Sequence, residues 1–217
     1  MGIRRSNFMG ANNGGGGGFG KALAFDGVED YCDLPSAASG SVLTISVWFK
    51  LNALGLQTIL GGNDVIDYFR FTDNTTIDIR GSKNLRFAVP ATSINTWHHV
   101  LCVVQSNSGR LFINGVESSS GTVINAVLNL DFNTVGWNSQ LNYFDGQLDN
   151  LLITNTASST PQAQATALYN GGLWVDPLTV IPTAQQLYRF NGNGNNDGTL
   201  GGALTLINFA ADPYVDH

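Results

Sequence analysis

The stretch SINTWHHVLCVV, residues 93–104, places a tryptophan and two adjacent histidines directly before an apolar run. Its second half is rich in β-branched and aromatic residues and follows a turn-forming cluster, which predicts a strand. Neighbouring side chains on a strand point to opposite faces, so His98 and His99 cannot both bind one metal ion. Cys102 shares the face of His98, but four residues of strand span about 13 Å, too far for a shared zinc. The stretch therefore predicts a structural strand.

Similar short runs recur from Lys21 onward, separated by turns rich in Gly, Asn and Asp. Asn114-Gly115, in the segment RLFINGVES, is the signal of a type I′ hairpin. A long series of short strands with such turns predicts an all-β, antiparallel two-sheet sandwich, because two stacked sheets bury alternate side chains. We expect Trp48 and Trp97 to be largely buried in this sandwich.

Composition limits the partners of the protein. Only 12% of its 217 residues are charged, and its net charge is −6, so no basic patch is available for nucleic acid. No apolar run approaches the ~20 residues of a membrane span, so membrane insertion is not expected. Arg4 and Arg5 are not followed by the apolar stretch of a signal peptide, which favours assembly in a cytoplasm. Cys32 and Cys102 lie among apolar neighbours, and we expect free buried thiols.

The chain divides into three parts. Residues 1–20 form a flexible Gly-rich arm. Its expected assembly anchors are Ile3, Arg4, Arg5, Phe8 and Met9. Residues 21–171 carry the strands and end in one short helix, where Pro161 fits the first helical position. Residues 172–217 form an apolar C-terminal extension, which we expect to pack on the same or a neighbouring subunit.

Six segments resemble the laminin-G-like branch of the concanavalin A-like lectin/glucanase superfamily. They are ALAFDGVEDYCDLP, LTISVWFK, NTWHHVLCVV, GRLFINGVE, FDGQLDNLLI and ATALYNGG, in the order and spacing of the family. The resemblance implies a two-sheet jelly roll in which the tryptophan–histidine strand is a core strand. Because this fold carries lectins, adhesion modules and glycosidases alike, it leaves the function open.

A glycosidase is disfavoured by the positions of the acidic residues. Retaining glucanases of this superfamily use two glutamates on one strand, but the only glutamates here, Glu29 and Glu117, lie far apart. Asp64 and Asp67 lie in a Gly/Asn loop at a spacing that would point them to opposite faces. We therefore expect no enzyme activity and no catalytic residues.

The resemblance implies a structural calcium site, since many superfamily members hold calcium between an early loop and a late strand. The matching positions are Asp26, Gly27 and Asp149. Carboxylate and carbonyl oxygens are the ligands that calcium prefers. The alternative is that Asp149 accepts backbone N–H groups at a turn.

A glycan site on this fold would use exposed aromatic side chains next to amides. The loop VGWNSQLNYFDG offers Trp137, Asn138, Asn142 and Tyr143. An aromatic face covers the apolar side of a sugar while amides bond its hydroxyls. The alternative is that Trp137 belongs to the core and the loop only packs.

Three function classes remain. The first is a non-enzymatic phage virion protein (head decoration, head fibre or tail), a homo-oligomer that contacts other virion proteins and host-surface glycans. It is favoured by the arm, the low charge and the apolar C-terminal extension. The second is a secreted bacterial carbohydrate-binding or adhesion module, which would act at the cell surface or outside the cell. The third, a glycosidase, is disfavoured by the missing acidic motif.

Overall fold

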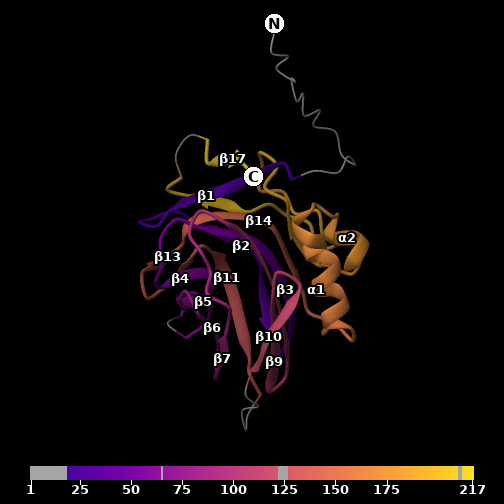
Figure 1. The fold of residues 1–217 in the computed structure, drawn as a ribbon. Helices are drawn as coiled ribbons and strands as arrows, with labels where there is room; N and C mark the ends of the chain where they lie inside the picture. The colour runs from indigo at the N-terminus through magenta and orange to yellow at the C-terminus, as the bar shows by residue number, and fades with distance from the viewer. Residues whose placement is uncertain (1–18, 65, 122–126, 210–211) are drawn as a thin grey trace, which may run out of the picture.

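The computed structural model describes residues 19–64, 66–121, 127–209 and 212–217. The chain folds into two stacked antiparallel sheets, sheet A and sheet B, with helices on one outer face (Figure 1). Sheet A contains β1 (Lys21–Asp26), β3 (Val42–Leu51), β8 (Trp97–Gln105), β9 (Ser108–Ile113), β10 (Val116–Gly121), β14 (Asp145–Thr154), β15 (Gln186–Tyr188) and β17 (Tyr214–Asp216). Sheet B contains β2 (Tyr31–Gly40), β4 (Gln57–Gly61), β5 (Tyr68–Asp73), β6 (Thr76–Arg80), β7 (Asn84–Ala88), β11 (Leu130–Val135) and β16 (Thr205–Ile207). This confirms the predicted all-β jelly-roll sandwich.

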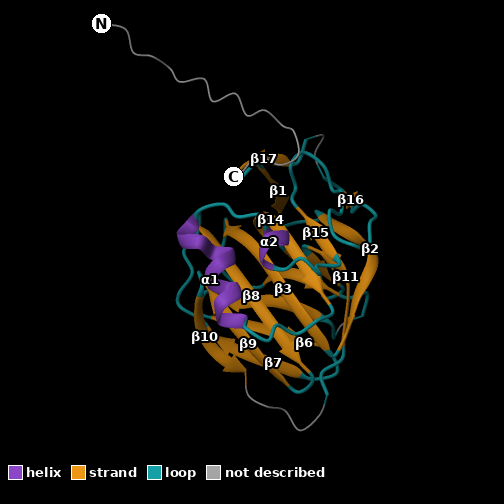
Figure 2. Ribbon diagram, turned by 90° about the vertical axis from the view of Figure 1, so that its right-hand side faces the viewer, coloured by secondary structure: helices purple, strands orange, loops and turns teal. Residues whose placement is uncertain are grey.

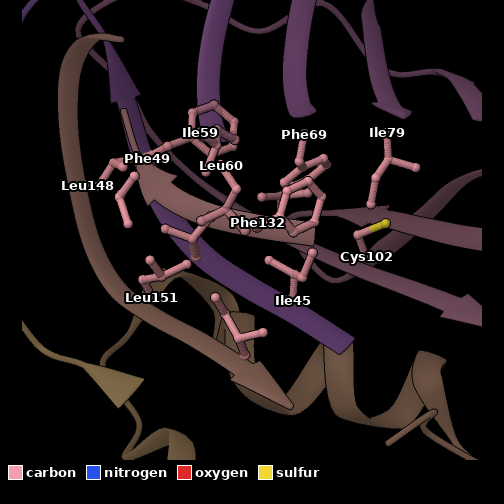
Figure 3. Close-up of a cluster of buried hydrophobic side chains, with 14 of the residues drawn as sticks. Ile45, Phe49, Ile59, Leu60, Phe69, Ile79, Cys102, Phe132, Leu148 and Leu151 are labelled. Carbon is pink, nitrogen blue, oxygen red and sulfur yellow. The ribbon is translucent and has the colours of Figure 1, made fainter. Parts of the chain in front are cut away.

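The core lies between the two sheets and is built from alternate side chains of their strands. Figure 3 shows Ile45 and Phe49 of β3 facing Phe69 of β5 and Phe132 of β11, all of them buried. Alternation along a strand sends every second residue inward, which is why these apolar positions recur at a spacing of two. Cys32 and Cys102 are free and buried, as the sequence predicts.

The helices cover the outer face of sheet A (Figure 2). They are α1 (Pro161–Tyr169), the 3-10 turn η1 (Asn170–Gly172) and α2 (Pro177–Val180). Ala165 and Leu168 of α1 pack on Leu101 and Phe112 of the sheet in a second apolar cluster. The sequence prediction of a single helix missed α2.

The C-terminal extension completes the sandwich of its own chain. β15 pairs with β14, β16 pairs with β2 and β17 pairs with β1. Of the two packing modes left open by the sequence, the described residues adopt the one on the same subunit. This arrangement gives the apolar side chains of the extension their partner surface.

The strand β8 separates its two histidines, as predicted. The His98 ring stacks on Phe49 of the inner face at 5.5 Å. His99 faces outward, is 1% exposed and shares a hydrogen bond of 2.8 Å with Ser46. Burial lowers the pKa of His99 to about 3, so this imidazole is neutral.

Both strand tryptophans are largely buried, as predicted, but to different degrees. Trp48 is 6% exposed, whereas Trp97 keeps more of its surface exposed. Trp97 begins β8 on the outer face of sheet A, beyond the cover of the helices. Its ring is covered instead by the imidazole of His217, at 3.7 Å between centroids.

Candidate functional site

A short hairpin on the outer face of sheet B carries the residues predicted to bind sugars. It consists of β12 (Trp137–Asn138) and β13 (Asn142–Tyr143), and it lies directly on Gly61 of β4. A Cβ atom at position 61 would lie 2.0 Å from the Trp137 carbonyl oxygen, so only glycine permits this approach. Thr134 of β11 holds the hairpin by donating its hydroxyl to that same carbonyl at 2.7 Å.

Three aromatic side chains form a row that we call the aromatic platform: Tyr31, Trp137 and Tyr143. The Trp137 ring lies 5.1 Å from Tyr31 and 6.4 Å from Tyr143, with interplanar angles of 35° in both cases. All three residues are half-buried, and Nε1 of the Trp137 indole is buried without a hydrogen-bond partner among the described residues. Trp137 belongs to neither apolar cluster of the described chain, which disfavours the alternative that it is a core residue.

The two predicted amides have different environments. Asn138 is 1% exposed, and its Oδ1 accepts the backbone N–H of Gln140 at 3.1 Å. Asn142 is half-buried beside the platform and donates its amide to Asn138 Oδ1 at 3.4 Å. The structure therefore brings together all four predicted residues, but it gives Asn138 the role of holding the hairpin. Asn142 is the amide within reach of a ligand.

Two neighbours of the hairpin were missed by sequence reasoning. Tyr31 comes from β2, more than 100 residues before Trp137 in the chain. Arg70 of β5 donates to the Gln140 side chain at 3.0 Å, and its guanidinium lies 3.8 Å from the Tyr68 ring. Neither residue has a local sequence signal that connects it to the hairpin, since only the order of the strands in sheet B makes them neighbours.

The residues predicted to bind calcium do not share one site. Asp26 ends β1 opposite Asp145, and its Oδ1 accepts the backbone N–H groups of Val28 and Glu29 at 2.8 and 3.2 Å. Asp149 lies four residues beyond Asp145 on β14, about 13 Å along the strand. Within the described ranges, no three His, Cys, Asp or Glu side chains gather into a metal-binding group. A calcium ion bound at Asp26 and Gly27 or at Asp149 stays a prediction.

Asp149 has a different set of partners. It is fully buried, its Oδ1 accepts the Asn150 N–H at 2.6 Å, and its Oδ2 shares a hydrogen bond of 2.6 Å with Nδ1 of His217. Burial raises the pKa of the Asp149 carboxyl, whereas burial and the charge of Lys50 lower the pKa of His217 to about 3. Both shifts favour the neutral form of this pair. The hydrogen bond donated by the Asn150 N–H matches the alternative drawn from the sequence, in which Asp149 accepts backbone N–H groups. It lies at a β-bulge between β14 and β3.

The acidic residues considered for catalysis have structural partners. Glu117 makes a paired ion contact with Arg110 on β9, at 2.6 and 2.7 Å. Asp64 accepts the Asp67 N–H at 3.0 Å, and Asp67 in turn accepts the Asp131 N–H at 3.2 Å. Burial, with the hydrogen bond and charge of Asp64, raises the pKa of Asp67 to about 7. Because Asp67 is only 5% exposed, its carboxyl has little access to a substrate.

One cavity on the opposite sheet lacks aromatic residues. It has a volume of about 350 Å³ and separates sheet A from the loop before α1. The predicted anchors Ile3, Arg4, Arg5, Phe8 and Met9 lie outside the described residues. No helix in the described part of the chain has the length and apolar character needed to cross a membrane.

The two stacked antiparallel sheets and the order of their strands define a concanavalin A-like β-sandwich. The family model Laminin_G_3, described as concanavalin A-like lectin/glucanases superfamily, matches residues 26–164. The chain belongs to this family. A search of curated proteins gave no match.

Solved structures share the fold. A candidate carbohydrate-binding protein from Bacteroides ovatus is 16% identical, with a TM-score of 0.60 over 90% of this chain and 61% of that one. Domain 4 of AbnA, an extracellular arabinanase from Geobacillus stearothermophilus solved with arabinotriose, is 25% identical, with a TM-score of 0.54 over 73% and 84%. A heptameric pentraxin from Limulus polyphemus is 12% identical, with a TM-score of 0.53 over 70% and 82%.

Proposed function

We propose that this protein is a non-enzymatic glycan-binding module whose site is the aromatic platform of sheet B. The observation that carries the proposal is the row formed by Tyr31, Trp137 and Tyr143, half-buried beside the amide of Asn142. Rings fixed in this way lose little conformational freedom when a sugar stacks on them. Asn142 supplies a donor and an acceptor for sugar hydroxyls.

The arabinanase domain gives the proposal a first ligand to test. Its structure holds arabinotriose, and it is similar to this chain over most of both lengths. A short neutral oligosaccharide of that kind is therefore a reasonable first probe. The ligand of this protein is to be found by screening, since the platform alone does not distinguish between neutral sugars.

The absence of enzyme activity is part of the proposal. Glu117 is engaged with Arg110, and Glu29 lies in the turn after β1, so the two glutamates do not flank one site. The pKa of the Asp67 carboxyl is raised to about 7, as a general acid would need, but this carboxyl is buried. Purified protein should release no reducing sugar from polysaccharides. Release that disappears in Asp67→Asn would overturn this part of the proposal.

The setting in which the module works stays a prediction. A secreted or surface-bound bacterial module would use the platform to hold its glycan outside the cell. The virion protein predicted from the sequence would use the same platform on the host surface, with residues 1–20 as its connector. Deleting residues 1–20 and measuring incorporation into particles tests the virion prediction, since the anchors on which it depends lie in that segment.

The glycan proposal is tested by a binding screen followed by calorimetry. An array of neutral and acidic oligosaccharides, with arabinotriose included, should give at least one ligand. Trp137→Ala should reduce the affinity for that ligand by about 5- to 150-fold, since loss of one stacked ring costs about 1–3 kcal/mol. Trp174→Ala is the matched control, because Trp174 is also half-buried but lies in the loop before α2. A screen without ligands, or equal losses in both variants, would refute the proposal.

A further inference from the structure

Next to the aromatic platform, the outer face of sheet B carries two arginines that we call the arginine pair: Arg70 and Arg80. The hairpin of the platform lies on Gly61, Gly61 is paired with Tyr68 on β5, and Tyr68 is paired with Arg80 on β6. Directly paired residues on neighbouring strands lie about 5 Å apart. The arginine pair is therefore part of the same surface as the platform.

Both guanidinium groups are held against one ring. Arg70 Cζ lies 3.8 Å from the Tyr68 ring and Arg80 Cζ lies 5.9 Å from it. Arg70 also donates through Nη1 to Gln140 of the hairpin, which links the arginine pair to the platform directly. Stacking on an aromatic face restricts a guanidinium while leaving its edge N–H groups free to donate. The Nε of Arg70 is buried and has no hydrogen-bond partner among the described residues.

The arginine pair is not neutralised by a carboxylate. Asp78 is paired with Arg70 across β5 and β6, but each of its two oxygens accepts from Arg86, at 2.8 Å in both cases. Ion pairs also engage the three basic side chains Lys21, Arg110 and Arg189. Among the described residues, Arg70 and Arg80 have no acidic partner within 4.0 Å, although the protein as a whole carries a net charge of −6.

Other acids lie near this surface and weaken it in part. Asp33 is exposed on β2 two residues after Tyr31, and burial together with the charge of Asp33 raises the pKa of the Tyr31 hydroxyl. Asp67 precedes Tyr68, and burial together with Asp64 raises its pKa to about 7, so near neutral pH it carries less than a full charge. Asp131 is exposed on β11, which is separated from β5 by β4. Two guanidinium groups beside a sugar platform on an acidic protein are an arrangement that attracts an anion.

We propose that the platform binds an acidic glycan, in which one sugar stacks on Trp137 or Tyr143 and its carboxylate or sulfate group is held by Arg70 and Arg80. The inference rests on the proposed glycan-binding function and adds the class of ligand. Guanidinium groups form paired hydrogen bonds with the oxygens of carboxylates and of tetrahedral oxyanions, and such charge-assisted bonds are about twice as strong as neutral ones. A neutral glycan of the same size leaves the arginine pair without a ligand.

Matched pairs of glycans that differ only in charge test the inference by calorimetry. Sialyllactose is compared with its carboxyl methyl ester, trigalacturonate with its methyl ester, and sulfated with unsulfated lactose. In at least one pair the acidic member should bind about tenfold more tightly, the gain expected from a charge-assisted hydrogen bond. Raising the salt concentration should reduce that advantage.

Variants separate direct contact from general attraction. Arg70→Gln and Arg80→Gln should each remove most of the advantage of the acidic member, while both variants keep the melting temperature of the wild type within a few degrees. Lys83→Gln is the matched control, because it removes one exposed positive charge from the turn between β6 and β7 of the same sheet. An advantage lost equally in Lys83→Gln would overturn the inference in favour of long-range attraction.

Three further outcomes would overturn the inference and differ in their meaning for the proposed function. If acidic and neutral members bind equally and Trp137→Ala abolishes both, the platform binds glycans but the arginine pair has no part in it. If no member of any pair binds, both the acidic ligand and the glycan-binding function are wrong. An acidic preference that survives both arginine variants would place the anion elsewhere.

Discussion

Gly61→Ala tests whether the position of the hairpin on sheet B creates the glycan site. The added Cβ would lie 2.0 Å from the Trp137 carbonyl oxygen and 2.8 Å from Asn138 Cβ. Ordinary contact begins near 3.4 Å, so the hairpin has to move outward by more than 1 Å. That movement also stretches the hydrogen bond of 2.7 Å from Thr134 to the carbonyl of Trp137.

The expected cost has two parts. Forcing a methyl group into a filled space destabilises a fold by about 1–3 kcal/mol, so the variant should remain folded with a lowered melting temperature. The larger effect should be on binding, because Trp137 moves away from Tyr31, which lies on the separate strand β2. We expect affinity for the best glycan of the screen to fall at least tenfold, which corresponds to about 1.4 kcal/mol.

Calorimetry and urea unfolding measure the two effects separately. Gly194→Ala is the control, because the nearest atom to its added Cβ is 3.2 Å away and lies in the C-terminal extension. The control should bind the glycan like the wild type. If Gly61→Ala binds with unchanged affinity, the close approach of the hairpin does not position the site and the account of the platform is wrong.

The remaining predictions concern stability and metal binding. His217→Ala should lower the free energy of unfolding by about 2–5 kcal/mol in urea, because it leaves the buried Asp149 without its side-chain partner and removes two stacking contacts; a loss below about 0.5 kcal/mol would mean that the pair is not formed. The raised pKa of Asp67 means that the folded state holds its proton more tightly, so stability should fall as pH rises from 4 through 7. Asp67→Asn should flatten that fall by at least about 1 kcal/mol, and an unchanged pH profile would contradict the burial of this carboxyl. If calcium is bound at Asp149, chelation by EDTA should lower the melting temperature and Asp149→Ala should remove the shift; an unchanged melt would leave Asp149 as the acceptor of the Asn150 N–H.

Local patterns were sufficient to predict the fold. Successive side chains of a strand alternate between its two faces, so the sequence predicted that His98 and His99 point in opposite directions. The structure has this arrangement. Asn114 and Gly115 have φ values of 50° and 78°, as a type I′ turn requires. The second helix was missed although its signal is local. Asp176 precedes Pro177, and its Oδ1 accepts the Leu178 N–H at 3.0 Å as a helix cap does.

The candidate site could be predicted only in the part that is contiguous in sequence. Trp137, Asn142 and Tyr143 lie in one loop, so composition was enough to select them. Tyr31 and Arg70 join them through the order β2, β11, β4, β5 in sheet B, which depends on strand pairing far along the chain. The environment of Trp97 could not be predicted for the same reason, because its ring is covered by His217, which is far away in the sequence.

Nuclear magnetic resonance of the four tryptophan indole groups tests the central claim most directly. The protein contains Trp48, Trp97, Trp137 and Trp174, and each gives one indole N–H signal. On titration with the best glycan of the screen, the Trp137 signal should move in a saturable way, while the signals of Trp48 and Trp174 stay in place. Binding that moves the Trp97 or Trp174 signal and leaves that of Trp137 unchanged would place the site off the aromatic platform and contradict the account.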